Sequence, residues 1–348
     1  MHGFGPRRLS VELTNICNLH CSYCLRDEDA LYHTPAHFFS PDLLNEILTQ
    51  AREVMGITAV IFTGGEPILH PEFERILEVS AANDLKISFV TNGWHFDRIW
   101  SSILTHREAI THVAFSLDGA TAATHDAWRG SGSFERVVRA FSRCFVTGIP
   151  FTVKVGIRRD TIQQLEQIAL FAARLGASSL NFAHIMPTSS EVEEASSLSY
   201  AERQQADQEI ANLARIFRMK IGIDVGYHNL DVSPPCSALA GVSANIDYLG
   251  RLSLCCNLAG FRGGLEDTDV VADLKTEDFA SAFARLSNLA SSQVEARRHR
   301  LESLENPSED PYVSSPCLFC LDTFGKLPWR GKFSNEVESR ALPVLQSR

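Results

Sequence analysis

The sequence lacks three features that would each point to a particular class of protein. It has no excess of basic charge: the net charge is −10 and the pI is about 5.7, which disfavours a general surface for nucleic-acid phosphates. It has no apolar run of membrane-spanning length, and its first residues contain no signal-peptide core. Low-complexity tracts and strict repeats are also absent. We therefore expect a cytoplasmic protein that binds neither nucleic acid nor a membrane.

The sequence does contain a regular alternation of apolar runs and helical patterns. Its 348 residues are 45% hydrophobic, which is enough for a large core in one to three domains. Because helical patterns separate the apolar runs, the strands should be parallel, in an α/β fold of the partial (β/α)6 TIM-like barrel type. Functional groups should then gather at the carboxyl ends of the strands. The six predicted strands cover residues 8–13, 58–63, 86–91, 112–117, 151–157 and 179–185.

Two of the helices have clear sequence signals. The first is expected to begin with Ser40 as N-cap and Pro41 at the first helical position, and to stop at Gly56. The second is predicted over residues 134–145, and Cys144 is expected in the core as part of its apolar face. That face consists of Val137, Val138, Phe141, Cys144 and Phe145.

The alternation fades after about residue 187. A further helix is predicted over about 200–218, and from about 225 the chain looks irregular and carries five of the nine cysteines. We therefore expect a barrel domain over residues 1–215 and a small irregular C-terminal domain over 216–348.

Three cysteines, Cys17, Cys21 and Cys24, follow the first predicted strand. In a cytoplasmic protein, such thiols are more often ligands or buried side chains than disulfides. Structural zinc normally uses four ligands, and a redox pair uses two. Three thiolates suit a four-iron cluster with one iron left open, since a cluster held entirely by protein uses four. A zinc site completed by His20 is the alternative.

These cysteines form part of a family signature. The stretch "CNLHCSYC" (17–24) resembles the cysteine motif of radical S-adenosylmethionine (SAM) enzymes. Four further segments resemble motifs of the same family in the expected order, namely "FTGGEP" (62–67), "SFVTNG" (88–93), "AFSLDG" (114–119) and "HDAWRGSGSFERV" (125–137). The resemblance implies that SAM and a [4Fe-4S] cluster are cofactors, with Cys17, Cys21 and Cys24 as the cluster ligands.

The resemblance also implies roles for residues at the strand ends. Gly64 and Gly65 would allow close approach of the backbone to the ligand, and the carboxylate of Glu66 would accept from the methionine ammonium group. Tyr23 would lie against the adenine. Ser116 is a candidate for polar contact with the ribose or the carboxylate of SAM. Asn92 is another candidate, although "TNG" is equally good turn chemistry.

Three charged or titratable residues are candidates for contact with the substrate. Lys154 lies within a barrel strand, where a charge is costly unless it faces a polar lumen; it would meet the SAM carboxylate or the substrate, or else extend to a rim. Asp118 is a candidate catalytic base by analogy with related maturases, and a turn aspartate before Gly119 is the alternative. His184, near the end of the sixth strand, is a further candidate.

The C-terminal cysteines resemble a second family feature. Their spacing is similar to the opening of the SPASM extension, an auxiliary-cluster module of radical SAM enzymes, in its truncated twitch form. The resemblance implies a second [4Fe-4S] cluster, with Cys256 as a possible substitute for Cys255, and a zinc ribbon is the alternative. The expected ligands are Cys236, Cys255, Cys317 and Cys320.

These features lead to a preferred function and two alternatives. We expect a radical SAM oxidoreductase that takes hydrogen from a sugar-, aminocyclitol- or nucleoside-like small molecule and oxidises it through the auxiliary cluster. The short stretch before the first strand, which leaves no room for a peptide-binding domain, motivates this preference. The first alternative is a maturase that oxidises, crosslinks or epimerises a side chain of a peptide or protein. The second is a non-catalytic metal scaffold. A flavodoxin or ferredoxin would supply electrons.

Overall fold

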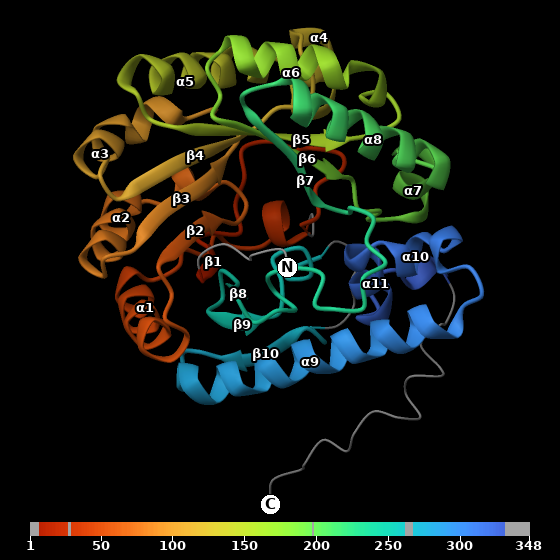
Figure 1. Ribbon diagram of the computed structural model, residues 1–348. Coiled ribbons are helices and arrows are strands. Elements are labelled where there is room, and N and C mark those ends of the chain that lie inside the picture. The colour runs from red at the N-terminus through yellow and green to blue at the C-terminus, as the bar shows by residue number, and fades with distance from the viewer. Residues whose placement is uncertain (1–6, 27–28, 197, 262–266, 331–348) are drawn as a thin grey trace, which may run out of the picture.

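A single ten-stranded sheet organises the chain (Figure 1). The computed structural model describes residues 7–26, 29–196, 198–261 and 267–330. Strands β1 to β7 are parallel neighbours in chain order, and β8 joins the other side of β1. The sheet curves around a central space in Figure 1, with helices on its outer face. The first seven strands are β1 (Arg8–Glu12), β2 (Ala59–Thr63), β3 (Lys86–Thr91), β4 (Ile110–Ser116), β5 (Phe151–Ile157), β6 (Ser179–His184) and β7 (Lys220–Val225).

Helices follow the strands and cover the outer face of the sheet. The predicted caps of the first helix, α1, are confirmed: the Ser40 side chain accepts from the Leu43 N–H, Pro41 is the first helical residue, and Gly56 ends the helix with φ 64°. This glycine adopts a left-handed conformation that other residues disfavour. The helices of this part are α1 (Pro41–Met55), α2 (Phe73–Ala82), α3 (Trp100–Thr105), α4 (Ala122–Arg129), α5 (Ser133–Thr147), α6 (Leu165–Arg174), α7 (Ser190–Ser196) and α8 (Tyr200–Ile216).

The two faces of the sheet differ in character. Successive side chains of a strand point to opposite faces, and one set forms the core against the helices; Val11, Phe62 and Val153 belong to it and are fully buried. The other set faces the central space and includes Glu12 and Lys154. The hydrophobic core therefore lies between sheet and helices, while polar side chains are left for the lumen.

The expected fold class is confirmed, because β1 to β6 coincide with the six predicted strands and are parallel in chain order. The expected domain boundary at 215/216 lies at the end of α8, and β7 follows it and pairs with β6. The sheet thus continues past that point, and the boundary itself stays a prediction.

The C-terminal part is more regular than the sequence suggested. Strand β8 pairs in parallel with β1, matching Arg8 with Ser243, and β9 and β10 continue the sheet in antiparallel fashion. A 25-residue helix, α9, runs beneath these strands in Figure 1. The remaining elements are β8 (Ser243–Ile246), β9 (Arg251–Ser253), β10 (Val270–Asp273), α9 (Phe279–Ser303), α10 (Pro311–Ser314) and α11 (Pro316–Thr323).

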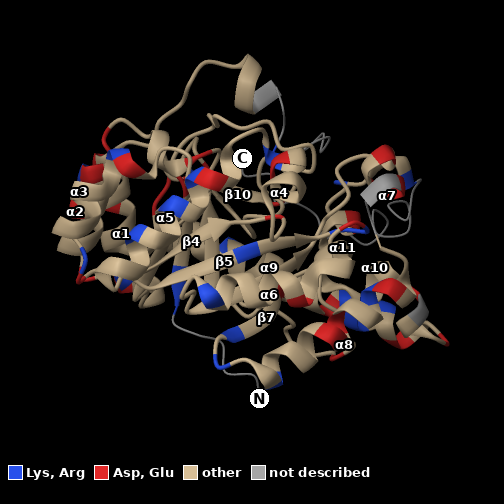
Figure 2. Ribbon diagram, turned by 90° about the horizontal axis from the view of Figure 1, so that it is seen from above, with Lys and Arg blue, Asp and Glu red and all other residues tan. Residues whose placement is uncertain are grey.

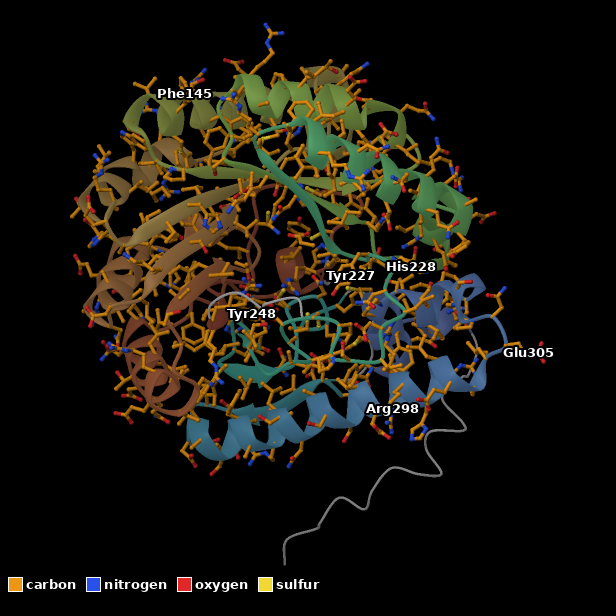
Figure 3. The ribbon with its side chains drawn as sticks, in the orientation of Figure 1. Phe145, Tyr227, His228, Tyr248, Arg298 and Glu305 are labelled. Atoms are coloured by element: carbon orange, nitrogen blue, oxygen red, sulfur yellow. The ribbon has the colours of Figure 1, made fainter. Side chains whose placement is uncertain are left out.

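The apolar face predicted for residues 134–145 is correct except at its end. Cys144 is fully buried in α5, as expected, but the neighbouring Phe145 is 62% exposed. Figure 3 shows Phe145 on the outer side of the fold. Its ring covers the backbone at Gly176, where an added Cβ would lie 2.2 Å from the Phe145 Cδ2 atom. The ring therefore packs against a glycine surface rather than into the core.

The surface of the described chain carries both signs of charge. In Figure 2, acidic and basic positions lie intermixed around α8, α10 and α11. Of the helices in the described part of the chain, none combines the length and the apolar character that crossing a membrane requires.

Candidate functional site

The three N-terminal cysteines lie in the loop that leaves the end of β1. The Cys24 N–H donates to the Cys21 carbonyl at 3.0 Å, so these two close a tight turn. Burial raises the pKa of the Cys17 thiol to about 12, and the charges of Glu66, Cys21 and Cys24 act in the same direction. The three thiols thus share one partly buried place, and a metal bound there would have to displace their protons.

Gly64 and Gly65 fix the end of β2 against this loop. The Gly65 N–H donates to the Thr14 carbonyl at 2.9 Å, and the Glu66 N–H donates to the Ile16 carbonyl at 2.8 Å. A Cβ at Gly64 would lie 2.5 Å from the Thr14 oxygen, and one at Gly65 would lie 2.1 Å from the Ile16 oxygen. Both positions therefore require glycine, because the backbone of residues 13–16 leaves no room for a side chain. Sequence reasoning had assigned these glycines to ligand approach and missed this backbone contact.

Glu66 is a buried carboxylate that receives several hydrogen bonds. It is 2% exposed and accepts from the Thr91 hydroxyl at 2.7 Å and from the Asn92 N–H at 2.8 Å. Burial raises its pKa to about 7, although these donors oppose the shift. The Asn92 side chain contacts Asn18 at 3.1 Å and the Cys17 sulfur at 4.0 Å. Asn92 therefore connects the carboxylate with the cysteine loop.

Two buried polar atoms beside this loop have no partner within the described residues. They are the Asn18 Nδ2 atom and the Thr63 hydroxyl, which immediately precedes Gly64. Buried polar atoms are normally hydrogen-bonded. Together with the carboxylate of Glu66, they suit a polar ligand bearing both donors and acceptors, such as the amino-acid part of SAM.

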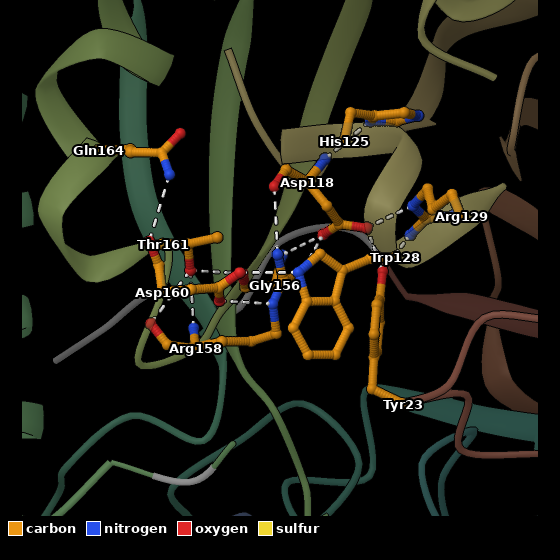
Figure 4. Close-up of polar contacts among 10 residues, drawn as sticks. All are labelled: Tyr23, Asp118, His125, Trp128, Arg129, Gly156, Arg158, Asp160, Thr161 and Gln164. Atoms are coloured by element: carbon orange, nitrogen blue, oxygen red, sulfur yellow. Dashed lines mark hydrogen bonds and ion pairs between the residues drawn. The ribbon is translucent and has the colours of Figure 1, made fainter. Parts of the chain in front are cut away.

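Asp118 is fully buried and forms the centre of a charge network (Figure 4). One carboxylate oxygen accepts from the Tyr23 hydroxyl and from Arg129 Nε, and the other lies 3.3 Å from Arg158 Nη1. Burial raises the pKa of Asp118, but the two guanidinium groups and Tyr23 outweigh it and bring the pKa down to about 2. A carboxylate held in this way is a weak base at neutral pH, so the network favours a positioning role over the expected catalytic one.

Tyr23 belongs to the same network rather than to an open surface. Arg129 Nη2 donates to its hydroxyl at 2.5 Å, and the guanidinium of Arg158 lies 5.4 Å from its ring centre. Arg158 itself lies 4.1 Å from the ring of Trp128, whose indole N–H donates to Asp160 at 2.7 Å. The expected contact of Tyr23 with an adenine ring stays a prediction.

Lys154 on β5 is held in an ion pair, and its expected contact with SAM or the substrate stays a prediction. Its ammonium group pairs with the carboxylate of Asp224 on β7, and Ser116 lies opposite Lys154 in the register of β4 and β5. Burial lowers the pKa of Lys154 and the charge of Asp224 raises it, with a net upward shift. His184 contacts Asp207 of α8 at 2.7 Å instead. Lys154, Asp224 and Ser116 thus form a polar group on the lumen wall.

Four of the C-terminal cysteines, Cys236, Cys255, Cys317 and Cys320, line a cavity. Cys255 lines it and its neighbour Cys256 does not, which favours Cys255 as the ligand. The apolar side chains that complete the wall exclude water from a bound group. The cavity is lined by Met186, Cys236, Ala238, Leu239, Leu254, Cys255, Asn257, Leu258, Pro316, Cys317, Cys320 and Leu321.

Hydrogen-bond donors point at these sulfur atoms. The Gly226 N–H donates to the Cys317 sulfur at 3.4 Å, and the Asn257 N–H donates to the Cys255 sulfur at 3.5 Å. The Gln293 amide donates to the Cys320 sulfur at 3.7 Å. Donors of this kind stabilise thiolates, as metal ligands require. Burial nevertheless raises the pKa of Cys317 to about 12, so metal binding here also releases protons.

A preformed zinc site would require closely spaced thiols. Around a tetrahedral zinc ion, with Zn–S bonds of about 2.3 Å, the sulfur atoms lie about 3.8 Å apart. Within the described residues, no three of the cysteines bring their sulfur atoms within 4.8 Å of one another. The described thiols are therefore not arranged as a preformed tetrahedral zinc site.

Arg26 connects the two sites, and sequence reasoning missed it. Its guanidinium lies 2.8 Å from the buried carboxylate of Glu12 on β1 and donates to the Ala259 carbonyl, and its backbone forms a bridge with Phe261. Arg26 is two residues from Cys24, and Ala259 is four residues from Cys255. The only sequence signal was an arginine directly beyond the cysteine motif.

Comparison with known proteins gives a family and several relatives. Residues 11–172 match the Radical SAM superfamily. Mycofactocin maturase MftC of Mycobacterium tuberculosis (strain CDC 1551 / Oshkosh) is 35% identical over 182 residues, which are 50% of this chain and 44% of that protein. AdoMet-dependent heme synthase of Nitratidesulfovibrio vulgaris is 28% identical over 200 residues, 53% of this chain and 52% of that protein. PqqA peptide cyclase of Streptomyces rochei is 27% identical over 180 residues, 52% of this chain and 48% of that protein. The chain spans about half the length of the curated relatives it matches.

Two solved structures resemble the fold over a larger share of the chain. Streptococcus suis SuiB bound to S-adenosylmethionine has a TM-score of 0.66 at 13% identity, over 82% of this chain and 68% of that one. SuiB bound to its precursor peptide SuiA has a TM-score of 0.65 at 14% identity, over 82% of this chain and 67% of that one. At this level of identity the likeness concerns the fold alone.

Proposed function

We propose that this chain, which belongs to the radical SAM superfamily through its residues 11–172, modifies a side chain of a peptide or protein in a SAM-dependent reaction. One observation carries the proposal: two sets of thiols lie in the same chain, one in the loop after β1 and the other around a cavity of the C-terminal part. The first set would hold a [4Fe-4S] cluster with an open iron. The second would hold a closed auxiliary cluster.

The described residues have distinct tasks in this proposal. When bound, SAM and the first cluster supply a 5′-deoxyadenosyl radical, which can take hydrogen from an unactivated carbon. Glu66 would accept from the amino group of SAM, and the backbone bonds of Gly65 and Glu66 hold this carboxylate against the cysteine loop. Asp118 anchors Tyr23 and Arg129 beside Cys21. Lys154 and Asp224 present opposite charges to the substrate from the lumen wall.

Relatives support a peptide or protein as the substrate, in preference to the small molecule first expected. MftC is named a maturase and PqqA peptide cyclase is named for its action on a peptide. A small-molecule substrate is the second candidate, because AdoMet-dependent heme synthase is also a relative. The auxiliary cluster would accept the electron left after hydrogen abstraction, so the net reaction would be an oxidation. A flavodoxin or ferredoxin would reduce the first cluster.

We also propose that the chain has two domains, with the division expected from the sequence. Residues 1–215 would bind SAM and its cluster, and residues 216–348 would bind the auxiliary cluster. The contact of Arg26 with Ala259 would hold the two parts in register.

An anaerobic assay tests the choice of substrate. The full chain, reconstituted and reduced, is incubated with SAM and with either the peptide or the small-metabolite fraction of a host extract. We expect 5′-deoxyadenosine to rise with the peptide fraction, together with a mass change in one peptide. The Cys17→Ala/Cys21→Ala/Cys24→Ala variant is the control. Stimulation by the metabolite fraction alone would overturn the peptide assignment while leaving the SAM chemistry intact.

A further inference from the structure

Helix α9 buries two polar residues on a face that is otherwise apolar. Its buried positions recur every three or four residues, as a helix packed on one side requires. Gln293 and Arg297 occupy two consecutive places in this series and are 8% and 2% exposed. The series is Phe279, Ala282, Leu286, Ala290, Gln293, Arg297 and Leu301. Burying a polar group in such a place costs free energy unless the group has a hydrogen-bond partner. The partners of Gln293 and Arg297 therefore indicate what the two residues do.

Gln293 is directed at a cysteine of the auxiliary site. Its amide nitrogen donates to the Cys320 sulfur at 3.7 Å and also to the hydroxyl of Thr323, one turn along α11. The donors to Cys317 and Cys255 are backbone N–H groups. Gln293 is therefore a side-chain donor to a cavity cysteine that substitution can remove.

Arg297 is a buried cation whose described contacts are all to carbonyl oxygens. It donates to the carbonyls of Asn229 at the loop after β7, of Asp231 at 2.9 Å, and of Val313 in α10 at 3.2 and 3.1 Å. No carboxylate pairs with it within the described part of the chain, although burying an unpaired charge is expensive. Burial lowers the pKa of Arg297, and the neighbouring Cys320, Tyr227, Cys236 and Asp231 act in the opposite direction. A cluster held by four thiolates is anionic and would supply a further, stronger counter-charge.

We infer that Gln293 and Arg297 form the outer sphere of the auxiliary cluster and raise its reduction potential. The inference rests on the proposed function. Gln293 donates to the sulfur of Cys320, and Arg297 balances the charge of the cluster while binding the loop after β7 and α10. Hydrogen bonds to sulfur and nearby positive charge both favour the reduced, more negative state. The pair therefore prepares the auxiliary site to accept an electron.

The test is a redox titration of the full chain carrying Cys17→Ala, Cys21→Ala and Cys24→Ala, so that only the auxiliary cluster is present. In this background, Gln293→Leu should lower the ratio of reduced to oxidised cluster at a fixed potential about fivefold, the factor that one net hydrogen bond represents. Gln293→Glu should lower it further. Arg298→Gln is the matched control, because Arg298 adjoins Arg297 in sequence but its side chain is 43% exposed (Figure 3).

Arg297 is tested through a pair of variants. Arg297→Lys keeps the charge and loses most of the carbonyl contacts, whereas Arg297→Gln removes the charge. We expect a lower reduced fraction in Arg297→Gln than in Arg297→Lys, which separates the charge from the structural role. An unchanged potential in Gln293→Leu, with the cluster intact by iron content and electron paramagnetic resonance, would overturn the inference alone. Failure of the background variant to bind any cluster would overturn the auxiliary site of the proposed function as well.

Discussion

The backbone N–H of Asn92 donates to the carboxylate of Glu66 at 2.8 Å, and this bond joins the ends of two neighbouring strands at the cysteine loop. The side chain of Asn92 serves a turn as well, because its oxygen accepts from the Trp94 N–H at 2.9 Å. Asn92 therefore stabilises the turn with its side chain and binds the Glu66 carboxylate with its backbone. The turn fixes the backbone that orients the carboxylate.

Glu66→Gln should weaken SAM binding. The substitution keeps the shape of the side chain but removes the charge that the ammonium group requires, so we expect the Kd for SAM to rise roughly 10- to 100-fold. Equilibrium dialysis with the reconstituted protein measures this. Glu72→Gln, a change at a side chain that is 51% exposed, is the control and should leave the Kd unchanged. Equal binding by Glu66→Gln and the native chain would remove Glu66 from the site.

Asp118→Asn should destabilise the protein at neutral pH. The change leaves Arg129 and Arg158 buried without their shared counter-charge, which costs about 3 kcal/mol of the free energy of unfolding. Asp118 has a folded pKa of about 2, below its ordinary value of 3.8. Its contribution is therefore present above pH 4 and is lost as the pH falls towards 2. Urea denaturation at pH 7 and pH 3 measures the difference.

The control for Asp118 is Asp97→Asn, which breaks an exposed ion pair with Arg143. That pair should contribute less than about 1 kcal/mol. If Asp118→Asn costs no more than Asp97→Asn, the buried network does not anchor the site.

Arg26→Gln should destabilise the protein more at pH 8 than at pH 6. Burial raises the pKa of Glu12 to about 7 against the opposing charge of Arg26. A carboxyl with a raised folded pKa is neutral in the folded protein below that value, so the free energy of unfolding falls as the pH rises from about 4.5 to 7. Above pH 7 Glu12 is ionised and needs the charge of Arg26. The loss of Arg26 therefore lowers the free energy of unfolding most at high pH. Thermal denaturation at both pH values tests this. Arg75→Gln, on an exposed pair with Asp42, should show no such dependence.

Cys255→Ser and Cys256→Ser should differ in iron content. The first change removes a thiol that lines the auxiliary cavity, whereas the second alters its neighbour outside the cavity. We expect Cys255→Ser to lose about four iron atoms per chain and Cys256→Ser to retain them. Iron and sulfide analysis after anaerobic reconstitution gives the answer. The reverse pattern would assign the ligand to Cys256.

The strands and the first cysteine site were predictable because their signals are local. Alternation of apolar runs indicated β1 to β6, and the caps at Ser40 and Gly56 were readable from single residues. The contacts of Asp118 were not readable in this way. Its partners Arg129 and Arg158 come from different elements, and only the folded chain places them around one carboxylate.

Helix α9 was missed for a different reason. Its buried face has helical spacing, but small alanines, Gln293 and Arg297 weaken the apolar pattern that would reveal it. The strand β8 was also missed, because four residues paired to β1 carry too short a signal. Elements with weak local patterns depend on tertiary partners for their stability.

Formation of 5′-deoxyadenosine from SAM tests the central claim most directly. The reconstituted and reduced full chain should produce it, and the Cys17→Ala/Cys21→Ala/Cys24→Ala variant should not, although it keeps iron at the auxiliary site. Cleavage of SAM by this variant at the native rate would contradict the account, because the site at the end of β1 would then not be where the reaction begins.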